Sequence, residues 1–219
     1  MEKMCDALGS ENKKLKEAAT YFSSVICRGE PTLVDKFIEK SPLNAIKKTL
    51  EGETDDDLLL DTYYIIINLV GVPYRFLRAV VEIGIGEVII DLLRTKQITP
   101  KVKRMAQKCL KRILKYGRYE DIETINKAKL LEILVDFLSS KNPDELRCGL
   151  KMLKYIMEHC AHEDELGEML GDFDAAGGVD ELLNIMNFPN EAINKMAKEV
   201  HDIYLYVRPL PDPLEAELN

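Results

Sequence analysis

Hydrophobic and polar positions follow a helical period through most of the chain. Residues 100–116 show it clearly, because their apolar side chains recur three or four positions apart and form one stripe on a helix. The stripe consists of Val102, Met105, Ala106, Cys109, Leu110, Ile113 and Leu114. The same pattern predicts long helices over 11–27, 54–70, 143–160 and 190–206. No stretch shows the sustained alternation of a β-strand, so the sequence predicts an all-α fold.

Shorter segments repeat between these long helices. Four of them, 33–50, 76–93, 121–138 and 169–186, share a short amphipathic stretch, a break and a second helix with a leucine-rich end. The ends of these segments are spaced 43, 45 and 48 residues apart, and breaks fall at Ser41-Pro42, Gly84 and Gly177-Gly178. Three helices per unit at about 40–47 residues is typical of armadillo repeats. We therefore expect a right-handed superhelical solenoid of armadillo (ARM/HEAT-like) repeats, in which stacking buries the stripes.

The repeats predict how the chain is organised. We expect a single array over 1–207, with a partial repeat at 11–29 and full repeats at about 31–71, 73–117, 119–161 and 166–207. Residues 1–10 are polar and are expected to be frayed, and 208–219 hold three prolines and three acids and are expected to form an extended tail. The first long helix would expose an apolar face unless residues 1–10 or another chain cover it.

Composition narrows the classes of function. The net charge of −8 argues against general nucleic-acid binding, which needs an excess of clustered Lys and Arg. The longest apolar run, 63–72, is too short to span a bilayer, and the polar N-terminal segment does not resemble a signal peptide. The five cysteines include no CxxC pair and are expected to be buried, reduced thiols. We expect a cytoplasmic and/or nuclear protein without nucleic-acid or membrane partners.

Signals of catalysis are weak or absent. The chain has no P-loop, nucleophile elbow or HExxH motif, and Gly84-Ile85-Gly86 lacks the third glycine of a dinucleotide loop. His159 and His162 stand near acids in a polar turn, where a solvated turn is the better interpretation than a metal site. We expect no enzyme activity, no catalytic residues, no cofactor and no metal.

One helix carries an unusual charge pattern. From Lys101 to Arg118 there are eight basic residues and no acid, although the whole chain is acidic. One stripe, opposite the apolar one, consists of Lys101, Arg104, Lys108, Arg112 and Lys115. It is expected to face the groove of the solenoid and to bind an acidic extended segment, as the lysine-rich groove of β-catenin-like armadillo proteins suggests. Two alternatives stay open: a solvated face, and pairing with the chain's own acidic patches at 51–57 and 163–174.

The repeat period and the stretch 130–207 resemble importin-α, the armadillo adaptor for nuclear localisation signals. The segment AAGGVDELLNIMNFPNEAINKMAKEVHDIYL resembles the final repeat of that family. Third helices of the family present a Trp to basic cargo, an Asn four residues later and often an acid three residues before the Trp. Helix 54–70 carries Asp61, Tyr64 and Asn68 at these offsets, and in helix 11–27 only the acid, Glu17, fits. Helix 100–116 departs from the pattern, because Lys108 and Arg112 stand at the Trp and Asn positions.

The resemblance implies an adaptor that binds an extended protein or peptide cargo in a concave groove, with transport receptors as further partners at the last repeat. The predicted peptide-binding residues are Glu17, Asp61, Tyr64, Asn68, Arg104, Lys108, Arg112 and Lys115. The chain has no Trp, and a lysine at a Trp position repels a basic cargo, so we expect weak or no binding of a bipartite basic signal. The alternative is a helical-repeat assembly subunit outside nuclear import that binds an acidic segment or a folded partner.

Overall fold

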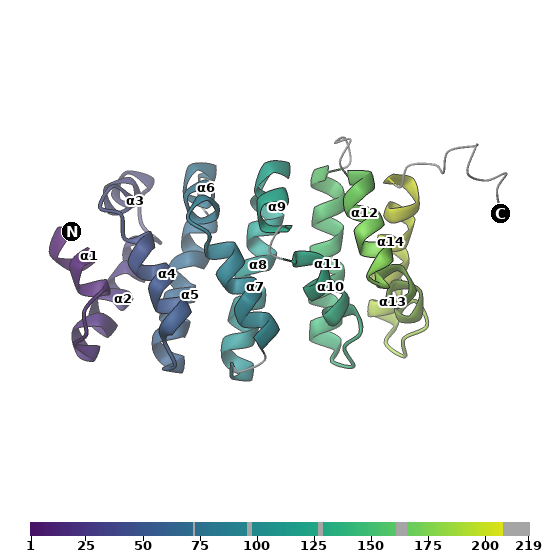
Figure 1. Ribbon diagram of the computed structural model, residues 1–219, viewed down its shortest axis with the longest axis horizontal. Coiled ribbons are helices and arrows are strands. Elements are labelled where there is room, and N and C mark those ends of the chain that lie inside the picture. Colours follow the sequence, from purple (N-terminus) through teal and green to yellow (C-terminus); the bar gives the residue numbers. More distant parts are fainter. Residues whose placement is uncertain (72, 96–97, 127–128, 161–165, 208–219) are drawn as a thin grey trace. The chain divides into compact units, whose positions relative to one another are not determined.

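The structure is a computed structural model that describes residues 1–219 except 72, 96–97, 127–128, 161–165 and 208–219. The described residues form fourteen helices and no strand (Figure 1). They divide into two compact units, Met1–Leu130 and Leu131–Asn219. The expected tail, 208–219, lies outside the described residues, as do 163–165 of the acidic patch at 163–174.

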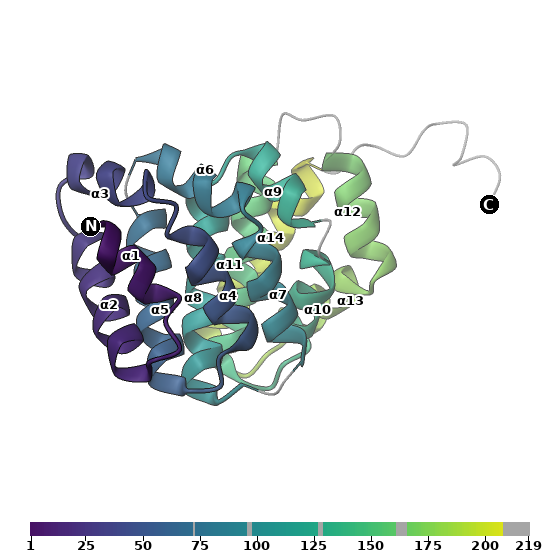
Figure 2. The same ribbon diagram turned by 60° about the vertical axis from the view of Figure 1, so that its left-hand side comes forward.

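Three long helices form the frame of the first unit: α2 (Lys13–Ile26), α5 (Asp56–Val70) and α8 (Pro100–Tyr116). Helix α5 packs against both α2 and α8, and Figure 2 shows the three side by side. Shorter helices lie between and around them: α1 (Glu2–Leu8), α3 (Pro31–Ile38), α4 (Leu43–Gly52), α6 (Tyr74–Glu82), α7 (Ile85–Thr95) and α9 (Tyr119–Asn126). Each long helix begins after a side chain that accepts a hydrogen bond from a first-turn N–H, at Asn12, Asp55 and Thr99. These caps satisfy donors that a helix start leaves without an intrahelical partner.

The second unit has the same order of short and long helices. It contains α10 (Leu130–Leu138), α11 (Pro143–Cys160), α12 (Leu166–Ala175), α13 (Gly178–Ile185) and α14 (Glu191–Val207). The long helices α11 and α14 pack against each other, as α2 and α5 do in the first unit. The predicted long helices therefore occur in both units, with ends that differ by at most two residues.

Left-handed backbone marks the break between the two short helices of each repeat. The four positions are Ser41, Gly84, Lys129 and Gly177, with φ of 54°, 82°, 69° and 81°. Their spacing of 43, 45 and 48 residues equals that of the leucine-rich ends. The third break was not predicted, because Lys129 holds a conformation that glycine adopts at less cost.

Gly177→Ala is expected to lower the free energy of unfolding by about 1 kcal/mol. A methyl group at this position would meet no atom within 4 Å, so the cost comes from the backbone conformation alone. Gly171 is the matched control: it is exposed within α12, it also has open space, and its φ is not left-handed. Gly171→Ala is expected to raise stability by up to about 1 kcal/mol. Urea unfolding followed by circular dichroism measures both, and equal effects would contradict this account.

The first ten residues are ordered, so the expectation that they are frayed was wrong. Residues 2–8 form α1, and Cys5, Ala7 and Leu8 are buried where α1 packs on α2 and α4. Met1, Met4, Cys5 and Leu8 recur at helical spacing, and this short stripe is hidden by the polar residues around it. Helix α1 thus covers one side of α2.

Candidate functional site: a groove between α5 and α8

An open groove of about 400 Å³ lies between the exposed sides of α5 and α8. Its lining residues are Asp57, Leu60, Asp61, Tyr64, Lys101, Arg104 and Met105. Three predicted site residues, Asp61, Tyr64 and Arg104, therefore meet in one groove. The α5 wall is acidic and aromatic, whereas the α8 wall is basic. Leu60 and Met105 were missed as lining residues; Met105 belongs to the apolar stripe of its helix but lies at its edge and is half-buried.

Two adjacent tyrosines on α5 differ in burial. The Tyr63 side chain is fully buried, whereas Tyr64 is 47% exposed and lines the groove. A tyrosine ring at the surface offers its face to a cation and its hydroxyl to a polar group. Tyr64 is thus placed to contact a ligand.

Asp61 lies half-buried beside Tyr64. Burial raises the pKa of its carboxyl above the usual value, the negative charge of Asp57 raises that pKa further, and Lys101 partly opposes both. It accepts no hydrogen bond from a described residue. A cationic group bound in the groove would stabilise the ionised form of this carboxyl.

Asp61→Asn is expected to raise the free energy of unfolding at pH 7 by up to about 1 kcal/mol. Because the pKa of Asp61 is raised in the folded state, the wild type loses stability as the pH rises through that pKa. The neutral variant lacks this loss, so the difference should vanish at a pH at which Asp61 is protonated. Thermal melts between pH 3 and 7 measure it, with Asp91→Asn, an exposed aspartate on α7, as the control. A destabilised Asp61→Asn at pH 7 would contradict the prediction.

Asn68 ties two long helices together. Its amide Nδ2 donates a hydrogen bond of 3.1 Å to the backbone oxygen of Ser24 at the end of α2. Asn68 was predicted to bind peptide, but the donor of its amide is held within the protein. A peptide can take the donor only by displacing this bond.

Arg112 packs at the end of α5 rather than standing free in the groove. A Cβ atom at Gly71 would overlap its guanidinium, so glycine leaves the room that Arg112 occupies. The guanidinium carbon lies 5.7 Å from the centre of the Tyr116 ring, and Nε is buried with no hydrogen-bond partner among the described residues. A cation near the last carbonyls of α5 is favourable, because they carry partial negative charge. The position of Arg112 against Gly71 therefore contributes to the packing of α8 on α5.

The remaining predicted residues differ in exposure and pairing. Arg104 and Lys108 are exposed and form no ion pair with a described residue, whereas Lys115 lies 4.9 Å from the centre of the Tyr116 ring. Glu17 is half-buried, 3.8 Å from Lys13 Nζ, and does not line the groove. Of the predicted basic residues, Arg104 and Lys108 thus have neither an ion pair nor a ring contact with a described residue.

Part of the acidic patch at 51–57 is paired within the first unit. Lys13 Nζ lies 2.5 Å from Asp55, Lys16 Nζ 3.1 Å from Glu53 and Lys101 Nζ 3.5 Å from Asp57. These bonds join the start of α5 to both α2 and α8. One member of the predicted basic stripe, Lys101, thus has an internal partner.

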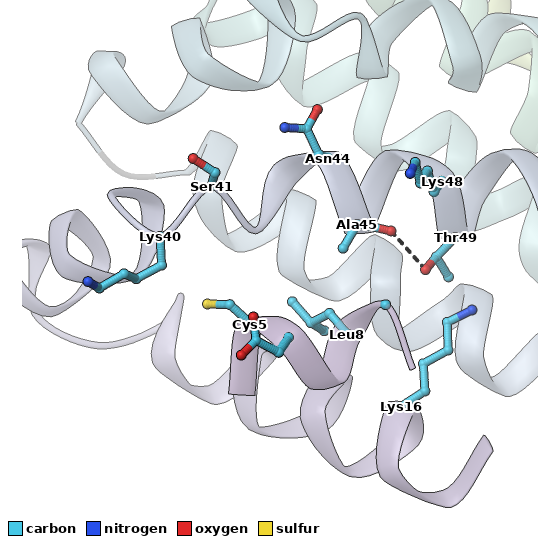
Figure 3. Close-up of a pocket in the computed structure, with 11 residues that line it drawn as sticks. Cys5, Leu8, Lys16, Lys40, Ser41, Asn44, Ala45, Lys48 and Thr49 are labelled. Carbon is cyan, nitrogen blue, oxygen red and sulfur yellow. Dashed lines mark hydrogen bonds between the residues drawn. The ribbon is translucent and has the colours of Figure 1, made fainter. Parts of the chain in front are cut away.

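A second cavity, of about 380 Å³, lies between α1 and α4, and no residue predicted to bind peptide lines it (Figure 3). Cys5 and Leu8 reach it from α1, and Asn44 and Thr49 from α4. The Thr49 hydroxyl donates to the backbone oxygen of Ala45, and burial raises the pKa of the Cys5 thiol. This cavity belongs to the packing of α1 on the first repeat.

The described cysteines are buried thiols, and the described residues form no metal site. Cys5, Cys27, Cys109 and Cys148 are buried, and burial raises the pKa of Cys27 to about 12. A raised pKa disfavours the reactive thiolate. Among the residues that the structure describes, no group of three or more His, Cys, Asp or Glu side chains could hold a metal ion. None of the described helices is both long and apolar enough to cross a membrane.

No known protein-family profile matches the sequence, and no curated protein matches it either. Solved structures do match. A computationally designed armadillo repeat protein for modular peptide recognition has a TM-score of 0.77 at 19% identity, over 95% of this chain and 82% of its own. A designed armadillo repeat protein in complex with the peptide (KR)4 has a TM-score of 0.76 at 18% identity, over 93% and 81%. An engineered protein has a TM-score of 0.65 at 19% identity, over 96% and 98%.

These likenesses confirm the predicted fold class: the chain is an all-α armadillo-repeat solenoid. At such identities they establish the fold and not a family.

Proposed function

We propose that this protein is a scaffold that binds an extended peptide across its third helices, with the groove between α5 and α8 as the central contact. The observation that carries the proposal is that exposed Tyr64 lines one groove together with half-buried Asp61 and with Arg104, which forms no ion pair with a described residue. A single exposed aromatic residue is common on protein surfaces, but Tyr64 shares its groove with both acidic and basic side chains. The designed neighbours, one made for peptide recognition and one in complex with (KR)4, support this use of the fold.

The chemistry of the groove favours a peptide of mixed charge. A lysine or arginine of the peptide can lie over Tyr64 and pair with Asp61. An acidic residue further along the peptide can meet Arg104 and Lys108, which have no ion pair with a described residue. A uniformly basic peptide meets repulsion from these two residues, and like-charge contacts in a partly dry groove cost several kcal/mol together.

The finer proposal is an adaptor similar to importin-α, with protein cargo in the groove, transport receptors as partners and a place in the cytoplasm and the nucleus. Asp61 and Tyr64 support it, since they stand at the acid and aromatic positions of that family. Two features oppose it. Lys108 stands at the next position where the family has an aromatic residue, and the Asn68 amide is already bonded to Ser24. The competing function is an assembly subunit that binds an acidic segment, favoured by the exposure of Arg104 and Lys108.

Titration with three labelled peptides of equal length tests these functions: (KR)4, its acidic counterpart (DE)4 and an alternating-block peptide KRKRDEDE. Fluorescence anisotropy at 50 and 200 mM salt gives each Kd. We expect the mixed peptide to bind most tightly, and its affinity to fall as salt screens the charges. An adaptor of the importin type would favour (KR)4 instead, and an acidic-segment binder would favour (DE)4.

Variants then locate the binding site. Tyr64→Ala and a double variant, Arg104→Glu with Lys108→Glu, are each expected to weaken the mixed peptide about tenfold or more. Lys198→Glu, which reverses an exposed lysine on α14, is the control and should leave the Kd unchanged. Affinity that none of the three variants alters would place the peptide elsewhere and reject the proposed site.

A further inference from the structure

The side of α2 that α1 does not cover is apolar and exposed. It consists of Leu15, Ala18, Tyr21, Phe22 and Val25, which we call the α2 outer face. Phe22 is 58% exposed, Tyr21 54%, Leu15 50% and Val25 43%, and Ala18 is also exposed. Large apolar side chains grouped in this way on a soluble surface mark an interaction site.

The repeat register shows what this face does elsewhere in the same fold. On α5 the residues 44 positions later are Leu59, Thr62, Ile65, Ile66 and Leu69, and none is more than 3% exposed. On α8 the next set is Lys103, Ala106, Cys109, Leu110 and Ile113, of which the last four are fully buried. In the first unit, the matching face is therefore buried on α5 and on α8, the two long helices that follow another long helix. The α2 outer face continues this established interface.

We propose that the α2 outer face binds the same face of a second copy of this chain, with the two α2 helices antiparallel. The apolar positions are spaced symmetrically about the middle of the helix. In an antiparallel pair Leu15 therefore meets Val25 of the second copy, and Ala18 meets Phe22. Small Ala18 leaves room for the aromatic ring, so the face complements itself, as a two-fold interface requires.

Charges at the two ends of α2 favour the antiparallel arrangement. Exposed Glu11 lies just before the helix, and exposed Arg28 lies just after it. Antiparallel pairing places Glu11 of each copy near Arg28 of the other, whereas parallel pairing places like charges together. The Tyr21 and Phe22 rings already pack edge to face, with centres 5.7 Å apart, and such a pair loses little freedom on binding.

Analytical ultracentrifugation over a concentration series tests this proposal, which does not depend on peptide binding. We expect a monomer–dimer equilibrium with a roughly micromolar Kd, since a single-helix interface is small. Phe22→Glu is expected to raise that Kd at least about tenfold. Tyr206→Glu is the control, because Tyr206 on α14 is even more exposed, at 89%, and lies outside the face. Unchanged thermal melts of both variants would show that the loss is not unfolding.

Cross-linking tests the orientation. Two single variants, Leu15→Cys and Val25→Cys, are mixed and treated with a short thiol cross-linker. Antiparallel pairing predicts that the mixed product forms much faster than either self-product, whereas parallel pairing predicts the reverse and would overturn the arrangement. A monomer at all concentrations would reject self-association and favour a helix of another protein as the occupant. Loss of the dimer in Tyr206→Glu would indicate that α14 of one copy contacts the second copy, as in head-to-tail association, and would also reject the proposal.

Discussion

Tyr63→Ala is expected to lower the free energy of unfolding by about 3–5 kcal/mol, whereas the neighbouring change Tyr64→Ala is expected to cost less than about 1 kcal/mol. Tyr63 is fully buried in the core of the first unit, so its removal leaves a large cavity. Tyr64 is 47% exposed, and its removal leaves a surface that water fills. Two identical residues that are adjacent in the chain thus serve as controls for each other. Urea unfolding followed by circular dichroism measures both.

Peptide binding should rank the same two variants in the opposite order. At a temperature at which both are folded, Tyr64→Ala is expected to lose affinity for the mixed peptide, and Tyr63→Ala to keep it. Tyr63→Phe extends the test, because the Tyr63 hydroxyl is buried without a hydrogen-bond partner among the described residues. Removing an unsatisfied hydroxyl is expected to stabilise the protein by about 1 kcal/mol. If Tyr63→Phe is destabilised instead, the Tyr63 hydroxyl forms a stabilising hydrogen bond and the prediction is wrong.

Asp121→Ala is the second change with a large expected effect, a loss of about 3 kcal/mol. The Asp121 carboxylate is 1% exposed at the start of α9, and its Oδ2 accepts hydrogen bonds from the Tyr74 hydroxyl at 2.8 Å and from the Arg118 N–H at 2.9 Å. Its other oxygen, Oδ1, lies 3.7 Å from Arg78 Nη1. Alanine would leave two donors and a nearby guanidinium without their acceptor. The change would weaken the packing of α6 on α9, two short helices of successive repeats.

Graded variants separate the charge of Asp121 from its hydrogen bonds. Asp121→Asn keeps an acceptor and is expected to cost less than alanine, and Tyr74→Phe, which removes one bond, about 1 kcal/mol. Asp91→Ala is the control, because that aspartate is exposed and only 3.9 Å from Arg94, and it should stay within about 0.5 kcal/mol of the wild type. Equal effects at Asp91 and Asp121 would show that the buried carboxylate does not stabilise the stack.

Much of the fold is predictable from local patterns. The long helices are predicted from their apolar stripes, and the repeat from the spacing of leucine-rich ends, because a helix buries one face at a fixed period. The break at Lys129 and the order of residues 1–10 were not predicted. At Lys129 no glycine marks the turn. The four apolar residues of α1 stand within a polar segment, and they order the helix only because α2 and α4 provide a surface on which they pack.

The candidate site is predictable only in part. Helical offsets place Asp61 and Tyr64 on one face, and the structure places both in the groove with Arg104. The offsets do not show that Asn68 donates to Ser24, that Arg112 packs at Gly71 or that Lys101 pairs with Asp57. Each of these contacts joins residues 41 to 44 positions apart, one repeat away. A single helix pattern carries no information about them.

By itself, the sequence determined the helical class, the repeat length and the sides of the helices that carry charge, because these depend on residues within one or two turns of each other. Only the tertiary structure decided which of those charged and polar side chains remain available to a ligand. In the first unit, stacking brings α5 against both α2 and α8, where Asn68 donates to Ser24, Arg112 packs at Gly71 and Lys101 pairs with Asp57. Side chains left without such a neighbour, Tyr64 and Arg104 in the groove and Phe22 on the α2 outer face, are available to other molecules.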